Sequence, residues 1–220
     1  MTLRLVIFDC DGVLVDSEGP SNRVVAAEIS ALGWPMNEAE STALFIGYRL
    51  SDIPPVVEAK LGRKVPEGWV ELLRDRLIAS FETIQTMPGA AETMRAITAL
   101  GLPFRVASNS SHEEMRVKFD RTGLAPLVAG RQHSARDVAR GKPAPDVFLA
   151  AAMAEGVAPA DCLVLEDSVP GVRAAVAAGM PVVGLDVHGD GAALAAAGAM
   201  TIRALSEFPV LVAGLMRRAA

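Results

Sequence analysis

The sequence predicts an α/β fold in which a parallel β-sheet carries one inserted helical segment. Short apolar runs alternate with longer stretches whose apolar residues recur at helical spacing, and glycines stand where the helices would stop. Strand, helix and strand in repeated order indicate a parallel sheet with right-handed crossovers. The alternation is interrupted once, between residues 18 and 85, where only helical patterns occur.

The first apolar run, residues 3–8, contains β-branched residues and is bounded by polar residues and glycine, as in a central strand of a parallel sheet. Similar runs predict strands at residues 104–107, 127–129, 162–165 and 181–185. Helical spacing predicts helices at residues 87–100, 111–122, 145–155 and 171–178, and an exposed alanine-rich helix at residues 192–199.

The interrupting stretch has helical patterns at residues 23–32 and 69–82. It is long enough for a small helical domain, termed the cap below, and Pro88 and Gly89 punctuate the return to the sheet. We therefore expect an α/β core domain made of residues 1–17 and 86–220, and a helical cap domain made of residues 18–85.

Length and composition restrict the class of function. The 220 residues can bury roughly 70% of their unfolded surface, so no disulfide or metal staple is needed. The net charge of -5 and the lack of a basic block argue against a nucleic-acid partner. No apolar run reaches the ~18 residues of a membrane span, and the first strand leaves no room for a signal peptide. Cys10 and Cys162 lie in apolar runs, where a reduced thiol acts as a small core residue, so we expect a cytoplasmic protein. We also expect a monomer or weak dimer, without nucleic-acid or membrane partners.

Asp9 and Asp11 follow the first predicted strand and precede Gly12. Open α/β sheets place their chemistry beyond the carboxyl ends of the strands, and side chains two apart in an extended segment point the same way. Crowding two carboxylates is costly unless a cation or a reacting phosphoryl group uses them. Carboxylates that only cap loop amides are the ordinary alternative. A calcium loop of the EF-hand type would need a flanking helix and a later glycine.

Polar residues also follow the second strand and the turn near residue 142. Ser108 and Asn109 offer a hydroxyl and backbone N–H groups at a helix start, which suits a phosphate, although plain helix capping explains them as well. Lys142 stands between glycine and prolines, which hold a turn rigid, whereas most lysines are solvated at the surface.

Glu166 and Asp167 end the fourth predicted strand. If the first and fourth strands are neighbours, Asp167 lies beside Asp9 and Asp11. Hard oxygen ligands of this kind select Mg²⁺, so the sequence predicts a magnesium site at this edge of the sheet.

These residues resemble the four motifs of the haloacid dehalogenase superfamily, in its branch of capped phosphatases and β-phosphoglucomutases. The motifs occur in order as DCDGVLVDSE from Asp9, Ser108 after FRVA, Lys142 in GKPAPDVF, and Glu166 and Asp167 in LVLEDS. The resemblance covers residues 3–183 and implies a Rossmann-like core, the fold of that superfamily, with an α-helical cap.

The resemblance also implies roles for the residues. Asp9 would be the nucleophile that forms an aspartyl-phosphate, and Asp11 the general acid for the leaving oxygen and later the base for water. Ser108 and the N–H of Asn109 would bind phosphoryl oxygens, and Lys142 would offset the charge of Asp9 and the phosphate.

A metal site is implied in the same way. Mg²⁺ would be held by the carboxylates of Asp9 and Asp167 and by the backbone carbonyl of Asp11, with Glu166 as a nearer or farther partner. The expected function is a Mg²⁺-dependent phosphatase acting on a small phosphorylated metabolite, either a sugar phosphate or a sugar-acid phosphate.

Three alternatives are weighed against this function. A true haloacid dehalogenase lacks the second aspartate, so Asp11 argues against it. A β-phosphoglucomutase carries a cap histidine shortly after the first motif, whereas residues 17–22 contain none, which favours water as the acceptor. A silent phosphoryl-binding protein would not need all of the motif residues.

In the cap, Glu18, Arg49 and Arg23 are candidates for substrate contacts, although a solvated face explains them equally well. His112, His133 and His188 show no ligand spacing, so no metal role is expected for them.

Overall fold

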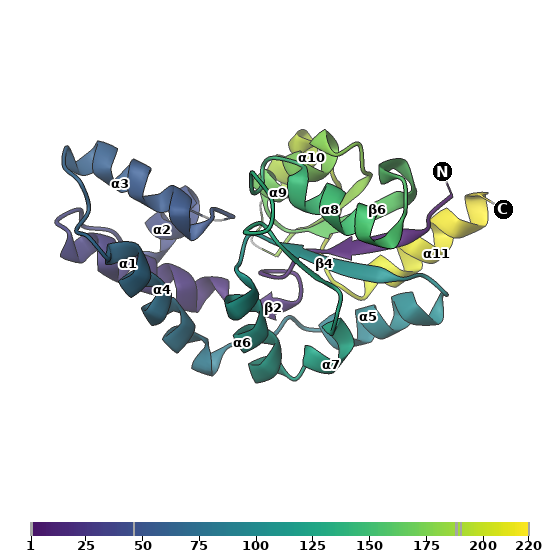
Figure 1. The fold of residues 1–220 in the computed structure, drawn as a ribbon. Helices are drawn as coiled ribbons and strands as arrows, with labels where there is room; N and C mark the ends of the chain where they lie inside the picture. The colour runs from purple at the N-terminus through teal and green to yellow at the C-terminus, as the bar shows by residue number, and fades with distance from the viewer. Residues whose placement is uncertain (1, 46, 188, 190, 220) are drawn as a thin grey trace.

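The fold is a parallel six-stranded sheet with helices on both faces (Figure 1). The computed structural model describes residues 2–45, 47–187, 189 and 191–219. The strands lie in the order β5-β4-β1-β6-β7-β8, and each described pairing is parallel. They span Leu5–Phe8 (β1), Phe104–Ser108 (β4), Gln132–Ser134 (β5), Cys162–Glu166 (β6), Val182–Leu185 (β7) and Met200–Ile202 (β8). The predicted α/β fold is thus confirmed, including the contact between the first strand and β6.

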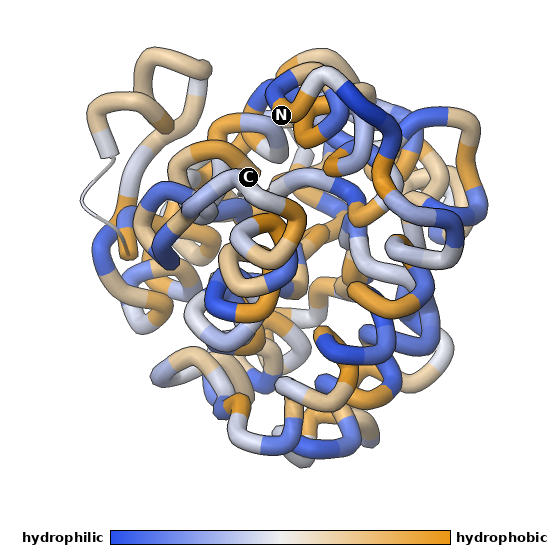
Figure 2. Tube along the Cα trace, turned by 90° about the vertical axis from the view of Figure 1, so that its left-hand side faces the viewer, coloured by the Kyte–Doolittle hydropathy of each residue, from blue (hydrophilic) through white to orange (hydrophobic). Residues whose placement is uncertain are grey.

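Side chains of β1 point alternately to the two faces of the sheet, because successive residues of a strand face opposite ways. Leu5 and Ile7 join the core beneath α8 (Asp146–Glu155), α9 (Val169–Ala177) and α10 (Gly191–Ala197). Val6 and Phe8 join the core beneath α5 (Ala90–Ala99), α6 (His112–Thr122), α7 (Ala125–Val128) and α11 (Glu207–Ala219). Figure 2 shows hydrophobic and hydrophilic residues alternating along the helical coils, as expected for helices with one buried face.

The cap consists of α1 (Glu18–Ala31), α2 (Glu38–Phe45), α3 (Ile53–Leu61) and α4 (Trp69–Ser80), which lie together at one side of the core (Figure 1). Helix α1 packs against both α2 and α4. Short 3₁₀ turns occupy Leu50–Asp52 (η1) and Phe81–Thr83 (η2), and a third lies in the core at Pro159–Asp161 (η3). The chain crosses between core and cap through β2 (Val15–Asp16) and β3 (Gln85–Thr86), which pair antiparallel. The domain boundaries at residues 17/18 and 85/86 remain predictions, and the β2–β3 pair lies next to them in the chain.

One predicted strand is wrong. Residues 127–129 lie at the end of α7, which has a proline in its first turn, where proline is tolerated. The strand that follows is β5, whose residues Gln132, His133 and Ser134 form no apolar run because it is a short strand at the edge of the sheet. Helices α2, α3 and α11 and strands β2, β3 and β8 are additional to those predicted. Helix α10 is mostly exposed, as expected, with Leu194 buried.

Both cysteines are buried free thiols, consistent with the role expected for them. None of the helices in the described residues combines the length and hydrophobicity needed to cross a membrane.

Candidate active site

The sheet brings residues that are far apart in the sequence to one edge. Strand β1 pairs with β4 on one side and β6 on the other, in a register that aligns Phe8 with Val106 and Leu165. The N–H of Asp9 donates to the carbonyl of Leu165 at 2.9 Å, which continues the ladder one residue past β1. Ser108 and Glu166 are the last residues of β4 and β6. The carboxyl ends of three adjacent strands therefore form a single site.

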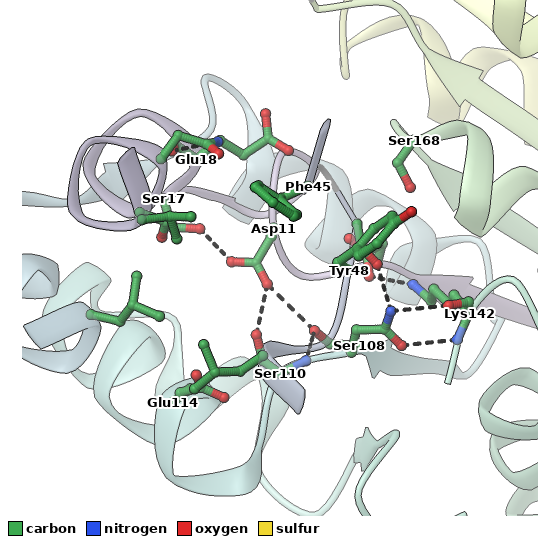
Figure 3. A pocket seen from close by; sticks show the side chains of 18 of the residues that line it. Asp11, Ser17, Glu18, Phe45, Tyr48, Ser108, Ser110, Glu114, Lys142 and Ser168 are labelled. Carbon is green, nitrogen blue, oxygen red and sulfur yellow. Dashed lines mark hydrogen bonds and ion pairs between the residues drawn. The ribbon is translucent and has the colours of Figure 1, made fainter. Parts of the chain in front are cut away.

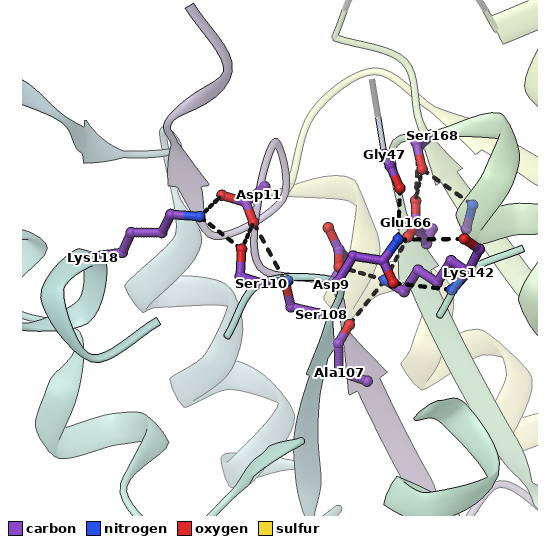
Figure 4. Close-up of polar contacts among 12 residues, drawn as sticks. Asp9, Asp11, Gly47, Ala107, Ser108, Ser110, Lys118, Lys142, Glu166 and Ser168 are labelled. Atoms are coloured by element: carbon purple, nitrogen blue, oxygen red, sulfur yellow. Dashed lines mark hydrogen bonds and ion pairs between the residues drawn. The ribbon is translucent and has the colours of Figure 1, made fainter. Parts of the chain in front are cut away.

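Lys142 is buried at the centre of this edge, only 5% exposed. Its Nζ donates to Asp9 Oδ1 at 2.5 Å, to Glu166 Oε1 at 2.8 Å and to the carbonyl of Ala107 at 2.9 Å (Figure 4). Burial opposes its charge, but Asp9 and Glu166 outweigh that effect and raise the pKa of Lys142. Lys142 is thus a cation fixed against the predicted nucleophile.

Asn109 links three segments through its side chain. Its Oδ1 accepts from the N–H of Lys142 at 3.0 Å, and its Nδ2 donates to the carbonyl of Gly47 in the cap at 2.6 Å. A Cβ at Gly141 would lie 2.7 Å from Asn109 Oδ1, so the glycine permits this close approach. The side chain of Asn109 therefore orients the turn that presents Lys142.

Three buried carboxylates, those of Asp9, Glu166 and Asp167, place oxygens within 4.8 Å of one another. Glu166 is engaged on both oxygens, by Lys142 and by the N–H and hydroxyl of Ser168 at 2.7 and 2.9 Å. In contrast, Asp167 Oδ2 is buried and has no hydrogen-bond partner among the described residues. A Cβ at Gly12 would lie 1.8 Å from this oxygen, so the glycine leaves room for the carboxylate.

The charge of this cluster fits a divalent cation. Burial, opposed by Lys142, raises the pKa of Asp9 to about 7. Burial and then the negative charges of Glu18, Glu166 and Asp9 raise the pKa of Asp167 well above its usual range. A hard cation would relieve both effects, and an all-oxygen donor set suits Mg²⁺. The residues present therefore fit the predicted metal, with the free oxygen of Asp167 as the strongest indication.

Asp11 lies in a different environment, on the side of the site away from Lys142 (Figure 4). Its Oδ1 accepts from Lys118 Nζ at 2.5 Å and from the hydroxyl of Ser17, and its Oδ2 accepts from the hydroxyls of Ser110 at 2.9 Å and Ser108 at 3.4 Å. Burial opposes ionisation of Asp11, but Lys118 and these hydrogen bonds outweigh it and lower its pKa. Asp11 is thus held as a carboxylate with both oxygens engaged.

Sequence reasoning missed Lys118, Ser17 and Ser110 as site residues. A lysine inside an amphipathic helix is normally solvated, so nothing in the pattern of α6 distinguishes Lys118. Ser17 and Ser110 lie next to motif residues in the chain, and that position was the available signal.

A cavity of about 140 Å³ joins this edge of the sheet to the cap (Figure 3). Its core side carries the motif residues described above, and Glu18 reaches it from the start of α1. The cap side is mostly apolar, with Ser21, Asn22 and the phenol of Tyr48 as polar exceptions. Its apolar residues are Val25, Phe45, Leu50, Ile53, Leu77 and Phe81.

Of the cap residues predicted to contact substrate, one lies at the cavity and two do not. Glu18 lines the cavity, whereas Arg49 is outside its lining and forms two hydrogen bonds with Asp52, at 2.9 and 3.1 Å. Arg23 pairs with Glu38 at the surface. Of the histidines, His112 contacts Asp137, His133 lies on the edge strand β5, and His188 lies outside the described residues.

The sequence and the fold match known proteins over most of the chain. The bifunctional riboflavin kinase/FMN phosphatase of Arabidopsis thaliana is 32% identical over 183 residues, which cover 81% of this chain and 47% of that protein, about half its length. The 6-phosphogluconate phosphatase of Escherichia coli is 29% identical over 182 residues, covering 82% and 81%. A crystal structure of a haloacid dehalogenase family hydrolase from Deinococcus radiodurans, with bound phosphate and sodium, has a TM-score of 0.77 and 33% identity over 96% of each chain.

The family itself is established by the match of residues 3–179 to the haloacid dehalogenase-like hydrolases. This match contains the strand-end residues that meet at the edge of the sheet. The chain therefore belongs to the haloacid dehalogenase-like hydrolase family.

Proposed function

We propose that this protein is a Mg²⁺-dependent phosphatase that cleaves a small phosphorylated metabolite through an aspartyl-phosphate. The observation that carries the proposal is the position of Asp9, which directly follows β1 and has Lys142 on one oxygen. Nearby lies an oxygen of Asp167 that has no hydrogen-bond partner in the part of the chain that the structure describes. A phosphatase needs an anionic nucleophile and cations that quench its repulsion from phosphate. The names of the phosphatases similar to this chain support the same reaction.

Without substrate Asp11 is a carboxylate, so it has to take up a proton from solvent as the substrate brings its negative charge into the cavity. In the first step a carboxylate oxygen of Asp9 forms a bond to phosphorus while the bond to the leaving oxygen breaks, and Asp11 gives that proton to the leaving oxygen. In the second step Asp11 takes a proton from water as the water oxygen attacks phosphorus, which releases phosphate and restores Asp9. Lys142, Ser108 and the N–H of Asn109 would hold the phosphoryl oxygens.

Asp9 and Asp167, with the backbone carbonyl of Asp11, would hold Mg²⁺. Glu166 would not bind the ion directly, because its two oxygens already accept hydrogen bonds from Lys142 and Ser168. The ion would supply positive charge against the phosphoryl group as negative charge moves through it.

The cavity favours a substrate whose leaving group is uncharged. Among the described residues that line it, the cations are Lys118 and Lys142, and both are paired with carboxylates. A carboxylate on the substrate would instead face the apolar cap wall and Glu18, at the cost of losing its hydration. We therefore propose a sugar or polyol phosphate in preference to a sugar-acid phosphate.

Phosphate release from a panel of phosphoesters, with Mg²⁺ or with a chelator, tests the reaction. Sorbitol 6-phosphate and 6-phosphogluconate form a matched pair, since they differ only in an alcohol or a carboxylate at C1. We expect Mg²⁺-dependent release and a higher kcat/KM for the alcohol. No release from any phosphoester would contradict the function, whereas a preference for the acid would contradict only the substrate class. Conversion of β-glucose 1-phosphate without phosphate release would indicate the mutase reaction.

A further inference from the structure

Lys118 is a second buried lysine, and none of the four motifs includes it. It lies in α6 with 3% of its surface exposed. Its Nζ donates to Asp11 Oδ1 at 2.5 Å and to Ser110 Oγ at 2.9 Å, and it lies 4.7 Å from the centre of the Phe81 ring. Figure 4 shows Lys118 approaching Asp11 from the side opposite Lys142.

Burying a lysine in this position costs free energy that its packing contacts alone would not offset. Removing an ammonium group from water is unfavourable unless a partner compensates, and an apolar side chain would fill the same space between helix and sheet more cheaply. The compensation comes from Asp11, from Ser110 and from the face of Phe81. The contacts of Lys118 thus converge on the one carboxylate that has to deliver a proton.

Residues that contact Asp11 or Lys118 also come from both chain segments that connect core and cap. Ser17, which donates to Asp11, follows β2, and Phe81, which covers Lys118, precedes β3. The two crossings pair with each other through β2 and β3, so Ser17 acts on Asp11 directly from one of them and Phe81 acts on it through Lys118 from the other.

We propose that Lys118 is a positioning residue that sets the orientation of the Asp11 carboxyl group for proton transfer to the leaving oxygen. The proposal rests on the proposed phosphatase function. Lys118 holds one oxygen of Asp11 and, through Ser110, constrains the other, so that the carboxyl group retains a fixed direction when the leaving oxygen replaces one of its hydroxyl partners. A lysine that merely stabilised the fold would affect all substrates equally.

The test compares substrates that differ in their need for a general acid. p-Nitrophenyl phosphate has a good leaving group that departs without a proton, whereas an alkyl phosphate needs one. The probes are p-nitrophenyl phosphate and the most rapidly cleaved alkyl phosphate of the panel. The measurement is kcat/KM, because this quantity contains the departure of the leaving group, while the later attack of water is common to both substrates.

For Lys118→Met we expect kcat/KM for the alkyl phosphate to fall by about 100-fold and that for p-nitrophenyl phosphate by less than about 10-fold. Lys118→Arg keeps the charge and should restore much of the alkyl activity. Arg116→Met is the matched control, since Arg116 lies on the same helix but is exposed and pairs with Asp120, and both activities should stay near wild type.

Equal loss on both substrates, or no loss on either, in a folded Lys118→Met protein would overturn the proposal. If that variant does not fold in a thermal unfolding assay, Lys118→Gln replaces it, and the same ratio of activities decides. A wild-type protein that cleaves neither probe would instead contradict the phosphatase function itself.

Discussion

The two aspartates of the first motif lie two residues apart, yet their surroundings are opposite. On the Asp9 side lie three buried carboxylates. Asp9 and Glu166 share Lys142, and Asp167 Oδ2 has no hydrogen-bond partner among the described residues. On the Asp11 side, both carboxylate oxygens are engaged by donors of the protein itself. The pKa of Asp9 is accordingly raised to about 7, whereas that of Asp11 is lowered.

This difference indicates how the site divides its work. The Asp9 side has one lysine for three buried carboxylates, and under the proposed function a cation and a phosphoryl group from outside would complete it. The Asp11 side is electrostatically complete and has to exchange a protein partner for substrate. Losses on the first side should therefore affect every substrate, and losses on the second should depend on the leaving group.

The largest effect is expected for Asp9→Asn, which removes the proposed nucleophile. Phosphate release should fall by about 10³-fold or more for alkyl and aryl phosphates alike. The fold should persist, because Lys142 keeps its hydrogen bonds to Glu166 and Ala107, and thermal unfolding checks this. Residual activity within tenfold of wild type would contradict the assignment of Asp9.

Lys142→Ala should follow, with a loss of about 10²- to 10³-fold in kcat/KM, because it removes the cation that is fixed at the proposed nucleophile. Lys64→Ala is the control: Lys64 also pairs with a glutamate, but its side chain is 89% exposed, so little change is expected. A Lys142→Ala rate close to that of Lys64→Ala would show that the Asp9 side does not depend on this lysine.

Gly12→Ala should weaken the proposed cation site, so that the Mg²⁺ concentration needed for half-maximal activity rises by about 10- to 100-fold. Gly12 has φ +74°, and its new Cβ would meet Asp167 Oδ2 at 1.8 Å. Gly62→Ala imposes a similar backbone strain, at φ +67°, with no atom within 4 Å of the added Cβ. If both variants respond equally to Mg²⁺, the effect is strain alone and the cation site is not involved.

The smallest effect concerns stability. Because Asp9 and Asp167 have raised pKa values, the folded cation-free protein binds more protons than the unfolded chain between the ordinary carboxyl pKa of 3.8 and the folded value of about 7 for Asp9. Its stability should therefore fall as the pH rises through this range. Adding Mg²⁺ at one fixed concentration, ~100 times its Kd at about pH 8, should raise the melting temperature by about 5 °C at that pH and by less at about pH 5, where protons compete for the carboxylates. Equal shifts at both pH values would argue against a cation on these carboxylates.

Much of the site could be predicted because its residues follow strands. A strand end can be located from an apolar run, and the carboxyl ends of parallel strands meet, so Asp9, Ser108 and Asp167 could be placed together from the sequence. Residues 127–129 show the limit of this reasoning, because a three-residue apolar run does not distinguish a strand from a helix turn.

Lys118 and Arg49 show that the sequence pattern could not decide which cations lie at the site. Lys118 is a cation inside a helix and Arg49 one just before a 3₁₀ turn. The sequence around them gives no reason to expect Lys118 beneath the site and Arg49 outside the cavity. The partner of Lys118 is Asp11, which is remote in the sequence and follows β1. The partner of Arg49 is Asp52, which is three residues away. Only the packing of α6 against the segments that cross to the cap separates the two cases.

The sequence by itself determined the α/β fold and the four motifs at the strand ends, because the hydrophobic period and the order of elements leave few alternatives. The tertiary structure decided the charge balance of the site, because the burial of a lysine and the engagement of a carboxylate oxygen depend on which remote segments pack together. That packing left Asp9 beside an incomplete cluster and surrounded Asp11 with its own donors.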